Sequence, residues 1–222
     1  MCIRDSKQAL HLAGFHAPGQ TEMLQQLSGS PEVAMMLVAP HLRVGLVTIH
    51  EPLARVPSLI TSRLVVRQVR IIHDALIQDW GITRPQIAVL GLNPHAGEGG
   101  DIGKEEQRHI LPALEELRRK GMVLEGPFPA DGFFARYIPG VYDAVIAMYH
   151  DQGLIPLKMS SGNLAVNVTA GLRLVRTSPD HGTAFQLAGH GTADPSSMQE
   201  AIRTAVSIAV HRRRHVRRRA HR

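Results

Sequence analysis

The segment QIAVLGLNPHAGEGGDIGKEE, residues 86 to 106, joins a strand-length apolar run, a glycine-rich turn and the start of a helical pattern. The order strand, turn and helix is typical of an α/β fold. The turn also suggests a nucleotide-binding loop, but both common motifs fail. A dinucleotide fingerprint needs glycine where Ile102 stands, and a P-loop needs glycine where Glu98 stands. His95, just behind the strand, is therefore the residue of interest in this turn.

Apolar runs of strand length alternate with helical patterns along the rest of the chain. The predicted strands are 43–49, 86–92, 143–149 and 164–170, and the predicted helices are 58–80, 104–120 and 196–211. Pro112 inside the second helix predicts a kink or a later start of that helix. Several strands are apolar throughout, which favours an α/β fold with a largely buried sheet.

Composition limits the class of protein. A chain of 222 residues with 44% hydrophobic content can form one large domain or two small ones. No run approaches the roughly 20 apolar residues of a membrane span, and no signal-peptide pattern opens the chain. The single cysteine, Cys2, excludes an internal disulfide. These features predict a cytoplasmic protein without a membrane partner.

The positive charge is concentrated at the C-terminus. Residues 211–222 contain seven arginines and no acid, so the rest of the chain carries a formal charge of −1 out of the total of +6. We expect this segment to be a solvated, disordered tail. A nucleic-acid-binding arm is less favoured, because no aromatic residues interleave with the arginines for base stacking. Residues 1–6, which lack periodicity, are expected to be a non-native leader.

Histidines occupy the same place behind three predicted strands. His50 directly follows RVGLVTI, His95 follows QIAVLGLNP, and His150 follows DAVIAMY. Ligands of open α/β sheets collect outside the carboxyl ends of the strands, so these imidazoles are placed to converge. Imidazole is a common ligand of Zn, Co, Ni and Fe, and three protein ligands leave one position for substrate. Each histidine also fits a hydrogen-bonded loop residue, and the pattern alone leaves both interpretations open.

Polar residues that suit an anionic substrate lie further along the chain. Lys158, Asn167 and Arg176 follow His150 on successive segments, and arginine can bind a phosphate or carboxylate with two hydrogen bonds. The turn GQTE, residues 19–22, is predicted to open a helix whose free N–H groups could receive an anion. Taken singly, each of these residues also fits an ordinary surface position.

Three segments together point to a family. GLNPHAGEGG, AMYHDQGL and RTSPDHGTAFQLAGHGTAD closely resemble signature segments of the 4-hydroxythreonine-4-phosphate dehydrogenase family of pyridoxal phosphate biosynthesis. The similarity runs from about Lys7 to Ile208. It implies an isocitrate/isopropylmalate dehydrogenase-like fold, in which two α/β domains flank a cleft. It also implies NAD or NADP as cofactor, one divalent metal ion (Zn, Mg or Co), and a homodimer that shares its metal sites between subunits.

The resemblance assigns roles residue by residue. The family's metal ligands fall on His50, His95 and His150, which the strand-end pattern also selects. The substrate-binding positions of the family fall on Gln20, Thr21, Lys158, Asn167 and Arg176. Cofactor contacts are implied for the DHGTA loop, through His181, Gly182 and Thr183. Lys158 and Asp151 are the candidates for the catalytic proton acceptor.

The implied reaction oxidises the C3 hydroxyl of 4-phosphooxy-L-threonine and then decarboxylates the product to 3-amino-2-oxopropyl phosphate. The metal would lower the pKa of the hydroxyl. Gln20 stands where the family's commonest motif has histidine, and glutamine cannot carry a positive charge. A sibling dehydrogenase of a sugar-acid phosphate, such as D-threonate or D-erythronate 4-phosphate, therefore stays open.

The second departure from the family is length, because its N-terminal third is missing. We expect residues 7–185 to form the metal- and substrate-binding domain. Residues 186–210 are expected to return to the truncated cofactor-side domain. The chain alone is expected not to turn over substrate, and a non-catalytic metal-binding fragment is the remaining alternative.

Overall fold

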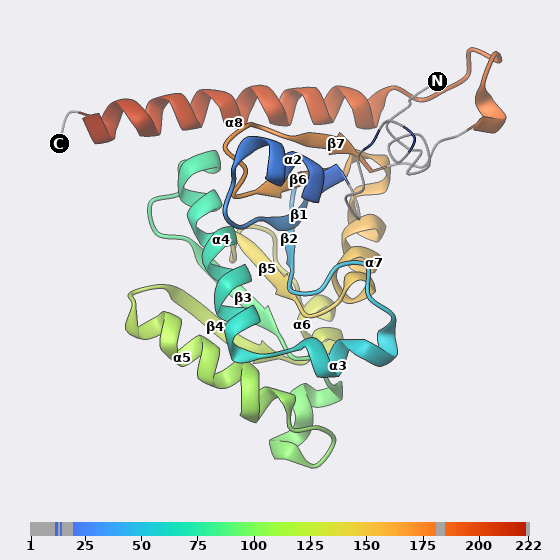
Figure 1. Ribbon diagram of the computed structural model, residues 1–222. Helices are drawn as coiled ribbons and strands as arrows, with labels where there is room; N and C mark the ends of the chain where they lie inside the picture. Colours follow the sequence, from blue (N-terminus) through green and yellow to red (C-terminus); the bar gives the residue numbers. More distant parts are fainter. Residues whose placement is uncertain (1–11, 13, 15–19, 181–184, 221–222) are drawn as a thin grey trace.

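The structure, a computed structural model, describes residues 12, 14, 20–180 and 185–220. Its centre is a seven-stranded sheet with the strand order β4-β3-β5-β2-β1-β6-β7 (Figure 1). The strands are β1 Ala34–Val38, β2 Arg43–Leu46, β3 Gln86–Leu90, β4 Val123–Phe128, β5 Ala144–Ala147, β6 Val166–Ala170 and β7 Thr177–Pro179. The α/β fold predicted from the sequence is confirmed.

The sheet is mixed, but most of its strands run in one direction. β4, β3, β5 and β2 are parallel to one another. β1 is antiparallel to both β2 and β6, so β6 runs in the same direction as β2. β7 is antiparallel to β6. The carboxyl ends of five strands therefore meet at one edge of the sheet, where ligands of α/β proteins usually bind.

Helices cover both faces of the sheet. The α-helices are α2 Gln20–Ser28, α3 Val56–Leu59, α4 Ser62–Trp80, α5 Leu111–Arg119, α6 Ala130–Ala135, α7 His150–Ser161 and α8 Ser196–Ala220. The shorter helices are η2 Leu53–Arg55, η3 Pro94–Gly100, η4 Glu106–Ile110, η5 Gly162–Leu164 and η6 Phe185–Leu187. None of the described helices is long and apolar enough to cross a membrane.

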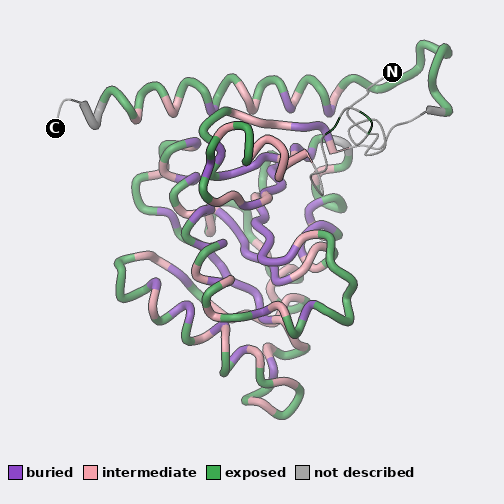
Figure 2. The backbone as a smooth tube through the Cα atoms, in the orientation of Figure 1, coloured by how far each residue is buried: buried purple, intermediate pink, exposed green. Residues whose placement is uncertain are grey.

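Two apolar cores lie on opposite faces of the sheet. Along β5, Ala144 and Ile146 belong to the core under α4, α5 and α8, whereas Val145 and Ala147 belong to the core under α7. This alternation follows from the two-residue period of a strand. All four residues are 0–1% exposed. The buried segments run through the centre of the molecule (Figure 2), as the continuous apolar strands predicted.

The predicted helix 58–80 is divided into α3 and α4. Thr61 has an extended backbone, and its hydroxyl accepts a hydrogen bond from the N–H of Leu64 (3.2 Å). This N-cap starts a new helix at Ser62. Gly81 ends α4 in a left-handed conformation (φ 70°), which glycine adopts without strain.

The predicted helix 104–120 starts late. A π-helical turn, η4, precedes α5, which begins at Leu111 with Pro112 in its first turn. Proline is tolerated there because a first-turn N–H has no partner within the helix. One of the two outcomes predicted from Pro112 is thus confirmed.

The prediction of a disordered tail over 211–222 is wrong for residues 211–220, which continue α8 as a helix. Arg212 explains why, since its guanidinium donates to both carboxylate oxygens of Asp79 and to the carbonyl of Leu172. Asp79 is 1% exposed, so the pair fastens α8 to α4. Arginine is also a good helix former. The last turns of α8 extend beyond the sheet (Figure 1).

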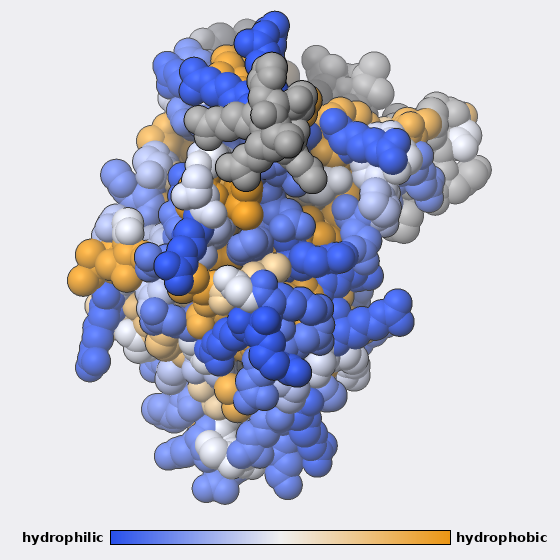
Figure 3. Space-filling model, turned by 90° about the vertical axis from the view of Figure 1, so that its left-hand side faces the viewer, coloured by the Kyte–Doolittle hydropathy of each residue, from blue (hydrophilic) through white to orange (hydrophobic). Residues whose placement is uncertain are grey.

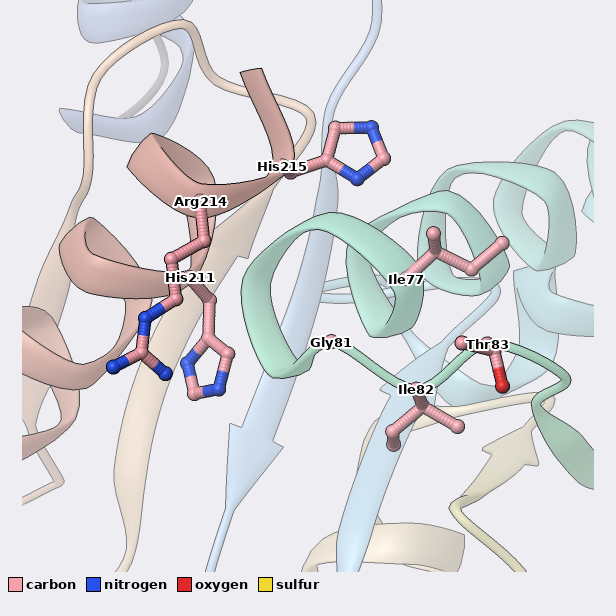
Figure 4. A pocket seen from close by; sticks show the side chains of 7 residues that line it. All are labelled: Ile77, Gly81, Ile82, Thr83, His211, Arg214 and His215. Carbon is pink, nitrogen blue, oxygen red and sulfur yellow. The ribbon is translucent and has the colours of Figure 1, made fainter. Parts of the chain in front are cut away.

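A small cavity of about 220 Å³ lies where α8 crosses the end of α4. His211 and His215 both line it, but their rings point in different directions (Figure 4). The Nδ1 atom of His211 forms a hydrogen bond within α8, with the carbonyl of Ser207 (2.9 Å). Seen from the end where α8 leaves the body, the surface is mainly hydrophilic, and hydrophobic side chains form separate patches (Figure 3).

Candidate metal and substrate site

The three histidines lie at the carboxyl edge of three neighbouring strands. β5 is central, with β3 on one side and β2 on the other. His150 begins α7 behind β5, His95 lies in η3 behind β3, and His50 follows β2. The ring centroids of His50 and His150 are 5.7 Å apart. The sheet therefore places all three histidines at the edge that their sequence positions predicted.

The ends of β2 and β5 are joined through a buried threonine. The hydroxyl of Thr48 donates to the carbonyl of Met148 (2.7 Å), and its backbone N–H donates to the same oxygen (3.1 Å). Thr48 is 6% exposed. Each of the two residues lies two positions before a histidine, so this contact fixes the spacing of His50 and His150.

The turn that carries His95 has an unusual backbone. His95 and Ala96 both have φ 51°, and Glu98 has φ 41°, so three non-glycine residues adopt the left-handed conformation. Each such residue costs on the order of 1–3 kcal/mol, and the conformation persists only where surrounding contacts hold it. Strain of this kind is concentrated at functional sites.

A buried carboxylate holds this turn. Glu106 accepts hydrogen bonds from the N–H groups of Leu92 (2.7 Å) and Asn93 (2.8 Å) and from the side-chain amide of Asn93 (2.9 Å). Glu106 is only 2% exposed. A Cβ atom on Gly97 would lie 2.6 Å from its Oε2 atom. Glycine is required at position 97 so that the chain can pass this carboxylate. This glycine therefore serves the packing of the turn, in agreement with the failure of both nucleotide-binding motifs.

Gln152 connects the turn behind β3 with the turn behind β5. Its side-chain amide donates to the carbonyl of Gly91 (2.6 Å), and its oxygen accepts from the N–H of Met148 (2.7 Å). Sequence reasoning missed Gln152 and Glu106. Gln152 lies two residues beyond His150, inside the segment that carries the family resemblance, whereas nothing in the local pattern marks Glu106 as buried.

The side chains at this edge supply part of the ligands that a divalent metal needs. Among the described residues, no three His, Cys, Asp or Glu side chains form a group that could hold a metal ion. His50 and His150 form a pair, and the Nδ1 atom of His150 is 2.7 Å from Oδ1 of Asp151. A metal-binding histidine commonly has its second nitrogen bonded to a carboxylate. The pair therefore fits part of a metal site.

Two of the predicted substrate residues lie together. The Nη1 atom of Arg176 donates to Oδ1 of Asn167 (3.3 Å) and to the hydroxyl of Thr169 (3.1 Å). Lys158 lies in the last turn of α7, where its Nζ atom pairs with Oδ2 of Asp180 (3.0 Å). The oriented guanidinium is suited to anion binding, whereas the charge of Lys158 is offset by Asp180.

The remaining predicted residues lie in α2 or outside the described residues. Gln20 and Thr21 are partly exposed in the first turn of α2, so this segment is helical from Gln20 onward and is not a turn that precedes the helix. The predicted cofactor contacts His181, Gly182 and Thr183 lie outside the described residues.

An aromatic cavity of about 600 Å³ adjoins His95. Phe128, Phe133 and Tyr142 line it, and their ring centroids are 5.3–6.2 Å apart. The hydroxyl of Tyr142 donates to the carboxylate of Glu125 (2.6 Å). Burial and this hydrogen bond raise the pKa of Tyr142 to about 12. Sequence reasoning missed the cavity, although the aromatic segment 128–142 was a signal for it.

Known proteins share both the sequence and the fold. The sequence model of the family "Pyridoxal phosphate biosynthetic protein PdxA" matches residues 5–205. The 4-hydroxythreonine-4-phosphate dehydrogenase of Trichlorobacter lovleyi is 51% identical over 209 residues, which are 93% of this chain and 62% of the relative. That of Geobacter metallireducens is 52% identical over 204 residues, which are 92% of this chain and 60% of the relative.

Solved structures agree. The crystal structure of 4-hydroxythreonine-4-phosphate dehydrogenase from Klebsiella pneumoniae superposes with a TM-score of 0.84 at 44% identity, covering 92% of this chain and 62% of that one. A terephthalate 1,2-cis-dihydrodiol dehydrogenase from Burkholderia xenovorans gives a TM-score of 0.71 at 33% identity, covering 91% and 64%. The chain thus shares its fold with solved α/β dehydrogenases.

Within that class, the chain belongs to the family of the pyridoxal phosphate biosynthetic protein PdxA. It spans about 62% of the length of the curated relatives that it matches.

Proposed function

We propose that this chain carries the metal- and substrate-binding part of an NAD- or NADP-dependent 4-hydroxythreonine-4-phosphate dehydrogenase of the cytoplasm. The enzyme would oxidise 4-phosphooxy-L-threonine at C3, and loss of CO2 would give 3-amino-2-oxopropyl phosphate. The observation that carries this proposal is the family match over residues 5–205, together with the three histidines at one sheet edge.

The His50 and His150 pair suits two of the ligand positions of a divalent ion. His50, His95 and His150 would hold Zn, Mg or Co, and a homodimer would complete each site with a histidine of the partner. When bound, the metal would polarise the substrate oxygen and stabilise negative charge on it. The 5.7 Å spacing of two rings and the bond between His150 and Asp151 support this assignment.

The substrate phosphate or carboxylate would bind to Lys158 and Arg176. Arg176 is oriented by Asn167 and Thr169, so it would lose little side-chain freedom on binding. Thr21 and Gln20, in the first turn of α2, would contact the same anion from a helix N-terminus.

Asp151 is a better candidate than Lys158 for the catalytic proton acceptor. The Nζ atom of Lys158 already pairs with the Asp180 carboxylate at 3.0 Å, which occupies it in a charge interaction. Asp151 lies next to His150, is exposed and can accept a proton from the substrate hydroxyl. The nicotinamide cofactor is assigned to His181, Gly182 and Thr183 from the family resemblance alone.

A second candidate is a sibling dehydrogenase that acts on a sugar-acid phosphate. Gln20 favours it, because a neutral side chain replaces the family's histidine at the predicted phosphate site. The likeness to a terephthalate dihydrodiol dehydrogenase also indicates that this fold serves dehydrogenases of different substrates.

The test compares this chain with a version completed by the missing part of a relative. Reduction of NAD and of NADP would be followed with 4-phosphooxy-L-threonine and with D-erythronate 4-phosphate. We expect turnover only in the completed enzyme, and faster with the first substrate. Replacing His50, His95 or His150 by alanine should each lower bound metal and reduce kcat/KM by roughly a hundredfold or more.

The control is His41→Ala, which removes an exposed histidine away from the candidate site. It should leave both metal content and turnover unchanged. If all three site variants keep their metal, the metal assignment is wrong. If D-erythronate 4-phosphate is the better substrate, the sibling activity replaces the main proposal.

A further inference from the structure

A second pocket lies at the edge of the sheet opposite to the histidines. It has a volume of about 320 Å³ and is enclosed by the end of β1, the start of β2, the end of α4 and α8. Arg43 is the first residue of β2, whereas His50 follows the end of that strand. The pocket is therefore separate from the candidate site. Small-molecule sites commonly have volumes of about 300–1,000 Å³.

Arg43 dominates this pocket and is poorly paired. Its Nη1 atom donates to the backbone carbonyl of Asp143 (3.2 Å), and its guanidinium lies 5.5 Å from the centre of the Trp80 ring. Its Nε atom is buried without a hydrogen-bond partner. In the described part of the chain, Arg43 makes no salt bridge. A buried, unpaired polar group is costly, so the protein itself satisfies the Arg43 guanidinium only in part.

The remaining charges leave the pocket positive. Arg203 and Glu200 both line it and form a pair at 3.4 Å, so their charges cancel. Arg43 then supplies one net positive charge. Burial lowers the pKa of Arg43, and Asp143 and Tyr137 act in the opposite direction. An anion in the pocket would relieve the same unfavourable burial of charge.

The other walls indicate what kind of anion fits. Val38, Pro40 and Leu164 are apolar, Trp80 offers an aromatic surface, and Thr204 adds a hydroxyl. A guanidinium matches the planar geometry of a carboxylate, and the apolar walls match a short hydrocarbon body. We propose that this pocket is a binding site for a small organic carboxylate, with Arg43 as its principal ligand.

The chain provides its own reporter, because Trp80 is the only tryptophan in the sequence. Intrinsic fluorescence would be followed while propionate is added at constant ionic strength. We expect a saturable change with a Kd on the order of 1 mM, given the small size of the probe. Chloride should give no saturable change. Inorganic phosphate should bind more weakly, because it lacks the hydrocarbon part.

Charge variants on the pocket rim test the assignment without disturbing the core. Arg203→Gln leaves Glu200 unpaired and should raise the Kd roughly two- to fivefold, whereas Glu200→Gln should lower it by a similar factor. Arg43→Lys keeps the charge but loses the planar fork, and should raise the Kd about tenfold.

Arg55 and Glu51 provide a matched control, because they form an exposed pair at 3.5 Å, four positions apart in the sequence and outside the pocket. Arg55→Gln and Glu51→Gln should leave the Kd unchanged. Three results would overturn the proposal: no saturable response to propionate, equal affinities in the Arg43, Arg203 and Glu200 variants, or tighter binding of phosphate than of propionate.

Discussion

Asp79 and Glu106 are both buried carboxylates, with 1% and 2% of their surface exposed, but their partners differ. Asp79 is neutralised by Arg212, which reaches it from a helix 133 positions further along the chain. Among the described residues, the donors to Glu106 are uncharged: the N–H groups of Leu92 and Asn93 and the Asn93 amide.

The difference separates two uses of a buried acid. The Asp79 pair joins two helices and therefore contributes to the stability of the whole chain. The Glu106 bonds shape a single turn, in which His95, Ala96 and Glu98 adopt left-handed conformations. We expect loss of the first to appear in global unfolding, and loss of the second to appear at the candidate site.

The largest effect should follow Arg212→Met. The change leaves the Asp79 carboxylate buried without its cation, which costs roughly 3 kcal/mol of unfolding free energy. Urea denaturation measures this loss. Arg213→Met, at the exposed neighbouring position, should change stability by less than about 0.5 kcal/mol. Equal effects of the two variants would mean that α8 is not fastened through Asp79.

Glu106→Gln should lower the free energy of unfolding less than Arg212→Met does. It should, however, disturb the candidate metal site more. The glutamine oxygen can still accept two backbone bonds, but its NH2 group faces the amide of Asn93, and one bond is lost. The expected cost is about 2 kcal/mol. Hydrogen exchange of the Leu92 and Asn93 amides should accelerate, and cobalt affinity should fall about tenfold.

Arg212→Met is the control for this experiment, since it should leave exchange at Leu92 and Asn93 unchanged under conditions where the chain stays folded. If Glu106→Gln changes global stability without faster exchange in this turn, the two buried acids have the same role and the distinction fails.

The smallest effect concerns an exposed acid, Glu125, which accepts a hydrogen bond from Tyr142. The pKa of Tyr142 is raised to about 12, above its ordinary value of 10, so folding favours the protonated phenol. The resulting stabilisation is present below pH 10 and is lost as the pH rises from 10 through 12. Urea midpoints at pH 9 and pH 11 should therefore differ less in Tyr142→Phe than in the unchanged chain. Identical pH dependence in both would show that folding does not raise the pKa of Tyr142.

Local sequence patterns predicted the regular elements that carry strong periodicity. The four predicted strands are all present, each shorter by two or three residues. α7 was missed because Gly153 and Pro156 interrupt its pattern. Gly153 is required by packing, since a Cβ there would lie 2.4 Å from the side chain of Val44. β7 was missed because it has only three residues and ends in proline.

The candidate site was predicted in part. The sequence placed His50, His95 and His150 behind strands, and it named Asn167 and Arg176, which the structure brings together. It did not predict Gln152 or Glu106, the residues that hold the turns in position. Gln152 reaches Gly91, 61 positions away, and the partners of Glu106 are 13 and 14 positions away, beyond the range of a periodic pattern.

What the sequence alone determined is local: apolar runs that form buried strands, polar residues at their ends, and the family to which the segments belong. The tertiary structure decided the order β3-β5-β2, which makes three separate strand ends neighbours. It also decided that Arg212 and Asp79 meet, which converts an expected disordered tail into helix. The physical reason is the same in both cases. Pairing between distant segments depends on packing of the whole core, and no local period encodes which strand or charge will be the partner.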